Sequence, residues 1–199
     1  LRQYSKPVQP MSLQEHTATC TGSGKDNNML NEKVQQALNE QFNAEMYSSY
    51  LYLSMNAWFK SINLDGFANW MVQQAKEELV HAMKFYDFIN QRGGRFVPAA
   101  IAAPPYEWDS PLAVFEDTLA HEQKVTGMIN NLVEIAGGEH DHATHIFLQW
   151  FVTEQVEEEE NAGNVLEQLR LVKEDKSGLF MIDRELLKRA APLEFTGAA

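Results

Sequence analysis

The sequence predicts an all-α protein, specifically a four-helix bundle with one long crossover connection and a short fifth C-terminal helix. From Leu30 onward, apolar residues recur at steps of three and four, which places them on one face of an α-helix. The helical segments are long and separated by short turns except once, where four prolines between residues 92 and 111 prevent a continuous helix. Strand signals are absent, so a helical bundle is the expected architecture.

The ends of the expected helices come from turn and capping residues. Asn63, Asp65 and Gly66 mark the first turn, and Gly93-Gly94 ends the second helix. Ser110 is a suitable N-cap for the third helix, with a proline at the first helical position. The expected helices are residues 31–60, 65–91, 111–136, 140–173 and 177–190.

The connection lengths predict the topology of the bundle. Two short turns favour antiparallel neighbours within the first pair and within the second pair of long helices. The long connection of about 18 residues can cross the length of the bundle, where each helix measures about 40 Å. An up-down-down-up bundle follows from these lengths.

Composition limits the classes of function. The net charge of −12 argues against nucleic acid or an anionic membrane surface as a partner, and it suits attraction of cations. The only cysteine, Cys20, cannot form an internal disulfide, so a reducing, cytoplasmic location is expected. The sequence contains no run of about 18 apolar residues, so no membrane-spanning helix is predicted.

The first 28 residues differ from the rest. They are rich in Ser, Thr, Gly, Pro, Gln and Asn without periodicity, which predicts a disordered N-terminal extension or leader. They also lack the apolar core of a secretory signal. Residues 29–199 are expected to form one domain, and removal of residues 1–28 is expected to leave its assembly and chemistry unchanged.

Each long helix carries a glutamate about halfway along its apolar face. Burial of an unpaired carboxylate costs several kcal/mol, so four such residues at matching heights call for a common explanation. The expected buried faces are Leu38, Gln41, Glu45, Ser48, Tyr52, Met55, Phe59 on the first helix, Phe67, Met71, Gln74, Glu78, His81, Phe85, Phe88 on the second, Phe115, Leu119, Glu122, Thr126, Ile129, Val133 on the third, and Phe147, Phe151, Glu154, Glu158, Ala162, Val165, Leu169 on the fourth.

A metal site explains the four glutamates. Converging carboxylates repel one another, and no Lys or Arg lies on these faces to neutralise them. Carboxylate oxygens with an imidazole nitrogen suit iron, manganese or zinc. Glu78 and His81, three residues apart on one helix, can bind one ion together, and a bridging glutamate would make a dinuclear site.

Taken alone, each of these residues has a simpler interpretation than a metal ligand. A single Glu-x-x-His pair is common on helix surfaces, and a tyrosine on a seam such as Tyr52 is most often a core residue. Within the acidic run 157–160, at least Glu159 and Glu160 are expected to face solvent. The histidines outside the seams are assigned no chemistry: His121, His140, His142 and His145.

The motifs on the four helices resemble those of the non-haem ferritins of bacteria and archaea. They are NAEMYSSYLYLSM, QAKEELVHAMKFYDFINQRGG, HE at 121–122 and FLQWFVTEQVEEE, in that family's order and spacing. The resemblance extends from Met29, which matches the family's usual start, to about Leu187. It implies the ferritin-like fold.

The resemblance also implies a set of site residues. Glu45, Glu78 and His81 would hold the first iron, Glu78 would bridge, and Glu122 would hold the second. Further roles are implied for four more groups: Gln155 near the second iron, Glu158 as a shared carboxylate, Tyr52 as a neighbouring electron donor, and Glu77, Glu154 and Glu157 as ligands of a third, weaker site.

Departures from neighbouring families exclude two cofactors. Leu79 replaces the haem-binding methionine of bacterioferritins, and the fourth helix lacks a second Glu-x-x-His, so no haem is expected. A single cysteine cannot supply the rubredoxin module of rubrerythrins.

The implied function is an iron-storage ferritin with ferroxidase activity. It would oxidise Fe(II) with O₂ or peroxide at a di-iron centre and store ferric mineral in a homo-oligomeric shell of 24 subunits, with the fifth helix near a symmetry axis. Two alternatives remain at this point: a di-iron oxidase or peroxidase without storage, and a structural bundle whose glutamates are satisfied by hydrogen bonds.

Overall fold

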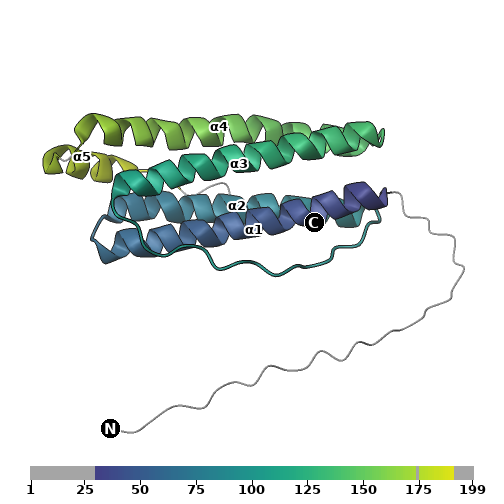
Figure 1. Ribbon diagram of the computed structural model, residues 1–199, viewed down its shortest axis with the longest axis horizontal. Coiled ribbons are helices and arrows are strands. Elements are labelled where there is room, and N and C mark those ends of the chain that lie inside the picture. Colours follow the sequence, from purple (N-terminus) through teal and green to yellow (C-terminus); the bar gives the residue numbers. More distant parts are fainter. Residues whose placement is uncertain (1–29, 174, 191–199) are drawn as a thin grey trace, which may run out of the picture.

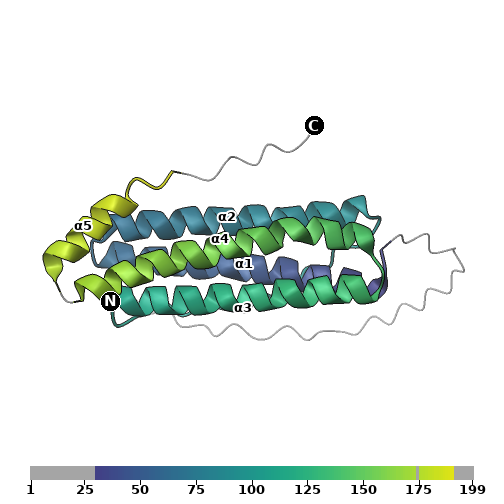
Figure 2. The same cartoon turned by 90° about the horizontal axis from the view of Figure 1, so that it is seen from above.

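The computed structural model describes residues 30–173 and 175–190, and these residues form an up-down-down-up bundle (Figure 1). Its four long helices are α1 (Glu32–Ser61), α2 (Asp65–Gln91), α3 (Pro111–Gly138) and α4 (His142–Val172). A short helix, α5 (Lys176–Leu186), lies across one end of the bundle (Figure 2). The predicted fold class is confirmed. The expected extension, residues 1–28, lies outside the described residues.

Side-chain caps begin four of the helices, each within two residues of its predicted start. Ser110 accepts a hydrogen bond from the backbone N–H of Ala113, and Pro111 follows at the first helical position, as predicted. Asp141 accepts from the N–H of Thr144, and Asp175 accepts from the N–H groups at the start of α5. Asn31 caps α1 through the N–H of Lys33.

The end of α3 differs from the prediction. Gly137 and Gly138 remain helical, and the chain turns instead at His140, which has a left-handed φ of 55°. The N–H of Asp141 then bonds the carbonyl of Ala136, so the end of α3 is closed without a glycine in the turn. At the second helix the prediction holds, because Gly93 takes the positive φ that ends α2.

Helix α5 ends at Leu186, four residues before the predicted end. Beyond it, the side-chain amide of Asn69 on α2 donates to the carbonyls of Leu186 and Arg189, each at 3.1 Å. The backbone there is bonded to α2 instead of continuing its own helix. Consequently the last described residues run beside α2.

The crossover, residues 92–110, lies along α1 (Figure 1). Asn39 receives a hydrogen bond from the N–H of Val97 and donates to the carbonyl of Arg95, while Ser54 donates to the carbonyl of Pro105. These contacts satisfy backbone groups that a proline-rich segment cannot pair with itself. The connection is therefore fixed along the bundle as it passes from α2 to α3.

The hydrophobic core consists of two clusters with a polar layer between them. One cluster, at the α5 end, contains Phe59, Phe67 and Phe115. The other, at the opposite end, contains Leu38, Phe85 and Phe151. Each of the four long helices contributes to both clusters and carries a buried glutamate between them. The apolar layers keep water from this polar layer and hold its side chains in place.

On α3, Phe115 and Ile129 are buried as predicted, but the other row of the predicted face is shifted by one residue. Thr118, Val125 and Leu132 are buried, whereas the predicted Leu119, Thr126 and Val133 are half-buried. A helix that packs against two neighbours has a wide apolar face, so both rows contact the core and only their order of burial differs. Glu122 is buried as predicted.

Candidate metal centre

The polar layer brings together carboxylates from all four long helices. The four seam glutamates Glu45, Glu78, Glu122 and Glu158 are at most 5% exposed. A carboxylate this deeply buried is costly unless it is paired, protonated or bound to a cation. The polar layer is therefore the candidate site for cation binding and catalysis.

The first half of the layer comprises Glu45, Glu78 and His81. One donor atom from each of these residues lies within 4.8 Å of the others. His81 Nδ1 is 3.4 Å from Glu78 Oε2, because the residues are one turn apart on α2. Gln41 donates to Glu45 Oε1 at 2.9 Å and orients that carboxylate. Three donors thus converge on one point, as the sequence predicts.

Two carboxylate oxygens in this half have no hydrogen-bond partner among the described residues while both carboxylates are ionised, and a proton on either group can join Glu45 to Glu78. The two oxygens are Glu45 Oε2 and Glu78 Oε2. The His81 nitrogen near Glu78 Oε2 is close enough for electrostatic attraction but is not in hydrogen-bond geometry. Buried carboxylate oxygens normally have partners, so this pair fits a cation as the missing partner.

The second half of the layer centres on Glu122. Tyr52 donates to its Oε1, and the Gln155 amide lies 3.4 Å from its Oε2 and 3.3 Å from its backbone carbonyl. Across the site, Gln74 donates to Glu158. These neutral donors orient the carboxylates and bring no positive charge, so the negative charge of the ionised groups is left for a metal ion to balance.

Burial changes the protonation of the layer. Desolvation, followed by repulsion from Glu78, raises the pKa of Glu45 from 4.5 to about 8. Desolvation, followed by repulsion from Glu122, raises the pKa of Glu158 to about 8 and holds that of Glu78 well above its ordinary value. For Glu122, burial raises the pKa to about 7 against the hydrogen bond from Tyr52. The metal-free layer therefore holds protons that a cation would displace.

On the fourth helix, the buried residue at the centre is the one that the resemblance implied, whereas the periodic pattern placed its neighbour on the seam. Gln155 is buried, whereas Glu154, expected on the seam, is half-buried at its edge. Glu154 still joins His81 and Glu158 in a second group of donors within 4.8 Å of one another. Desolvation raises its pKa, with repulsion from Glu157 and Glu77 adding to the effect.

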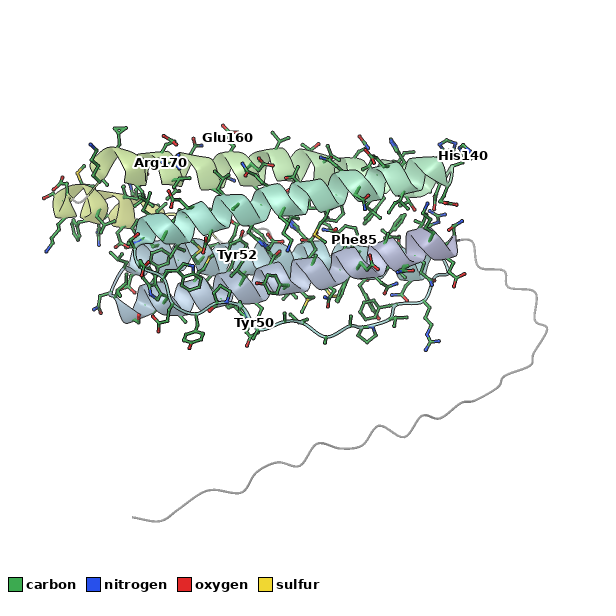
Figure 3. The ribbon with its side chains drawn as sticks, in the orientation of Figure 1. Tyr50, Tyr52, Phe85, His140, Glu160 and Arg170 are labelled. Atoms are coloured by element: carbon green, nitrogen blue, oxygen red, sulfur yellow. The ribbon has the colours of Figure 1, made fainter. Side chains whose placement is uncertain are left out.

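The residues expected at a third site are only partly gathered. Glu77 is half-buried and forms an ion pair with Arg189, and Glu157 is exposed. Of the two residues expected to face solvent, Glu160 does so and points away from the bundle (Figure 3), whereas Glu159 is half-buried and accepts a hydrogen bond from Thr126. The expectation for Glu159 is wrong because α4 packs its side chain against α3.

Sequence patterns did not identify several residues that support the centre. Gln41 and Gln74 were expected in the core, without a role as hydrogen-bond donors to the glutamates. His121 was assigned no chemistry, yet its Nε2 lies 2.8 Å from Ser48 Oγ and its ring packs edge-on against Tyr52. Burial, with Lys124 nearby, lowers the pKa of His121 to about 4, so the ring is neutral. The direct adjacency of His121 to Glu122 was the available signal.

Tyr52 points into the bundle, whereas Tyr50, two residues away, lies on its outside (Figure 3). Burial and the negative charge of Glu122 hold the pKa of Tyr52 well above its ordinary value, so its hydroxyl remains a donor. Fold and site together define a four-helix bundle with a buried layer of carboxylates and one histidine whose donor atoms are suited to binding metal.

Comparison with known proteins gives the family. Residues 35–172 match the ferritin-like domain, and the chain belongs to the ferritin family. The bacterial non-heme ferritin of Bacteroides fragilis (strain 638R) is 44% identical over 161 residues, which cover 81% of this chain and all of that protein. That of Staphylococcus saprophyticus is 43% identical over 162 residues, covering 81% of this chain and 97% of the relative. The resemblance to non-haem ferritins is confirmed.

Solved structures agree with this assignment. An open pore ferritin from the hyperthermophilic archaeon Archaeoglobus fulgidus superposes with a TM-score of 0.81 at 55% identity, covering 82% of this chain and 99% of that one. A closed form of the same ferritin, engineered by site-directed mutagenesis, gives 0.81 at 54% identity, with the same coverage of 82% and 99%. Within the described ranges, no helix combines the length and the apolarity needed to span a membrane.

Proposed function

We propose that this protein stores iron and is a ferroxidase, oxidising two Fe(II) ions per subunit at the polar layer and retaining the ferric product in a closed homo-oligomeric shell. The unpartnered oxygens of Glu45 and Glu78, buried between two apolar clusters, are the observation that carries the proposal. Membership of the ferritin family supports storage, and the sizes of the relatives match this domain. A shell of 24 subunits is the expected assembly.

The residues would divide the two ions between them. Glu45, Glu78 and His81 would bind the first, and Glu122 with Glu158 would bind the second, Glu78 lying between the two halves. Carboxylate-rich sites with one imidazole suit both Fe(II) and Fe(III), because hard oxygen donors stabilise the higher oxidation state. Gln155 and Tyr52 would orient the carboxylate of Glu122 through hydrogen bonds.

The chain's own contribution to the oxidation is geometry, proton release and exclusion of water. Each Fe(II) gives up one electron, and the two electrons with two protons from water reduce one O₂ to hydrogen peroxide or one hydrogen peroxide to two water molecules. The carboxyl groups lose their protons as the ions bind, which sets an anionic environment that favours the ferric products. The phenylalanine-rich clusters on either side keep the site closed to bulk solvent.

The decisive experiment is anaerobic addition of Fe(II) followed by air. The wild-type protein should develop ferric absorbance much faster than buffer, and Glu78→Gln should slow it at least tenfold. Glu160→Gln removes an exposed glutamate from the same bundle and should have no effect. Equal rates for wild type and Glu78→Gln would refute the site.

Storage is tested separately from oxidation. Size-exclusion chromatography and electron microscopy should show a hollow particle that retains far more iron than two ions per subunit. A monomer or dimer that oxidises iron without retaining it would instead support a di-iron oxidase. A shell that neither binds nor oxidises iron would support the structural alternative.

A further inference from the structure

Two side-chain contacts join α1 to α3 beside one another at the polar layer. Tyr52 donates to the carboxylate of Glu122, and the Oγ of Ser48, one turn earlier on α1, lies 2.8 Å from the Nε2 of His121. His121 and Glu122 are consecutive residues of α3. The two contacts therefore link the same two helices at the same height, and one of them holds a carboxylate of the site.

The contact between Ser48 and His121 has a defined direction. The Ser48 hydroxyl donates its one hydrogen to the backbone carbonyl of Ala44 at 3.1 Å. Its oxygen can then only accept, so the Nε2–H of the His121 ring is the donor. This hydrogen bond fixes the imidazole in one tautomer and one orientation.

Packing alone does not enclose the His121 ring. The residue is half-buried and borders a surface cavity of about 460 Å³, whose wall also includes Ala102 and Met128. On its other sides the ring meets Tyr52 edge-on, with centroids 6.0 Å apart and planes at 85°, and Tyr47 at 5.9 Å. A ring that borders a cavity can tilt unless a polar contact holds it, and Ser48 supplies that contact.

The orientation of His121 matters to Tyr52. Edge-to-face contacts between aromatic rings are directional, so the orientation of one ring constrains that of the other. Tyr52 is fully buried, and its hydroxyl reaches Glu122 only when its ring is correctly turned. A His121 ring that tilted toward the cavity would leave Tyr52 without this edge and its hydroxyl less well aimed at the carboxylate.

We propose that His121 is a positioning residue for the second metal ion: anchored by Ser48, it keeps Tyr52 in the orientation that holds the Glu122 carboxylate ready to bind. The inference rests on the function proposed above, because it assumes that Glu122 binds the second ion. Among the described residues, His121 belongs to neither group of convergent donor atoms, so it acts through Tyr52 and not as a ligand. Its effect should fall on the second ion and spare the first.

The test is anaerobic calorimetric titration of Co²⁺ into the assembled, metal-free, full-length protein, with visible absorption reporting the coordination of each bound ion. Wild type should show two tight sites per subunit. Ser48→Ala removes the acceptor, and His121→Phe keeps a ring but removes the donor. Each should weaken the second site by about two- to tenfold, the range for one neutral hydrogen bond, and alter the absorption of that ion alone.

Two further variants separate the hydrogen bond from general disruption of α3. His121→Gln should retain most of the wild-type affinity, because its amide nitrogen can donate to Ser48 from nearly the position of the imidazole Nε2. Gln123→Ala is the matched control, since Gln123 is the exposed residue on the other side of Glu122, and it should leave both sites unchanged.

A double variant shows whether His121 acts through Tyr52. When Tyr52 is already Phe, Ser48→Ala should cost little further affinity, because the hydroxyl that it helps to position is absent. Ser48→Ala also keeps the comparison available if His121→Phe fails to assemble. Full additivity with Tyr52→Phe, equal weakening of both sites, or an unchanged second site in Ser48→Ala overturns this inference, and two tight sites in wild type leave the proposed function intact. Absence of the two tight sites in wild type overturns the proposed function itself.

Discussion

Tyr52 on α1 donates a hydrogen bond to the carboxylate of Glu122 on α3, across the centre of the bundle and over 70 positions of sequence. Both side chains are fully or almost fully buried, at 0% and 1% exposed. The bond joins the apolar cluster that contains Tyr52 to the polar layer that contains Glu122. It also favours the ionised form of Glu122, which is the form that binds metal.

Tyr52→Phe should therefore weaken binding of the second ion more than the first. Loss of the donor raises the pKa of Glu122 further above about 7, so protons compete better with metal near neutral pH. A hydrogen bond to a charged group is worth about 1.5–3 kcal/mol, which bounds the loss at roughly ten- to a hundredfold. Zn²⁺ titration at pH 6.5 and 8.5 measures it, and a deficit equal at both pH values would contradict this explanation.

Metal binding should release protons and strengthen with rising pH. Glu45 and Glu158 have pKa values of about 8 and Glu122 about 7, so the metal-free site is largely protonated at pH 6. Each proton displaced makes affinity rise about tenfold per pH unit below these values. Titrations at one pH in buffers of different ionisation enthalpy count the protons. Proton release below one per ion at pH 6.5 would be inconsistent with the raised pKa values.

Much of this site could be predicted because it lies on regular helices. Periodicity alone places Glu45, Glu78 and Glu122 on buried faces, and the connection lengths bring those faces together. Periodicity was less able to predict which residue faces the centre where a helix contacts two neighbours. On α4, Glu154 and Gln155 are adjacent, and packing buries Gln155 more deeply. Family resemblance pointed to Gln155, whereas the periodic pattern favoured Glu154.

Contacts that depend on irregular chain were not predictable from periodicity. The Arg189–Glu77 pair requires the chain to leave α5 and return along α2, which depends on hydrogen bonds from Asn69. His121 was overlooked for a related reason, since its burial depends on the crossover as well as on α3. Residues of the crossover, Ala100 and Ala102, line a cavity together with His121.

The metal-free protein should become less stable as pH rises from about 5 to 9. A carboxyl group with a raised pKa binds more protons when folded than when unfolded, so its stabilising contribution is full below 4.5 and is lost as pH passes 7 to 8. Differential scanning calorimetry should show a falling Tm across this window. Glu45→Gln should flatten the slope, while the exposed Glu160→Gln should keep it. Saturating Zn²⁺ should remove the fall, because the charged carboxylates then have a cation.

The contact of α5 with α2 gives the sharpest test of the fold. Asp183 on α5 accepts hydrogen bonds from the backbone N–H groups of Gly66 and Phe67, at 2.7 and 3.1 Å, which caps the start of α2. A Cβ at Gly66 would lie 1.6 Å from the Asp183 carbonyl oxygen, so no side chain fits while α5 stays in place. Gly66→Ala should therefore displace α5 and lower stability by about 2 kcal/mol or more, from the lost cap and lost packing.

Gly127 on α3 supplies the matched control, because a Cβ there meets nothing within 4 Å. Gly127→Ala should raise stability by about 0.5–1 kcal/mol through helix propensity alone. Thermal unfolding of both variants, with size-exclusion chromatography of each, separates the two effects. If α5 contributes to assembly, Gly66→Ala should also shift the particle toward smaller species while Gly127→Ala does not. A Gly66→Ala protein as stable as wild type would mean that the packing of α5 on α2 does not hold in solution.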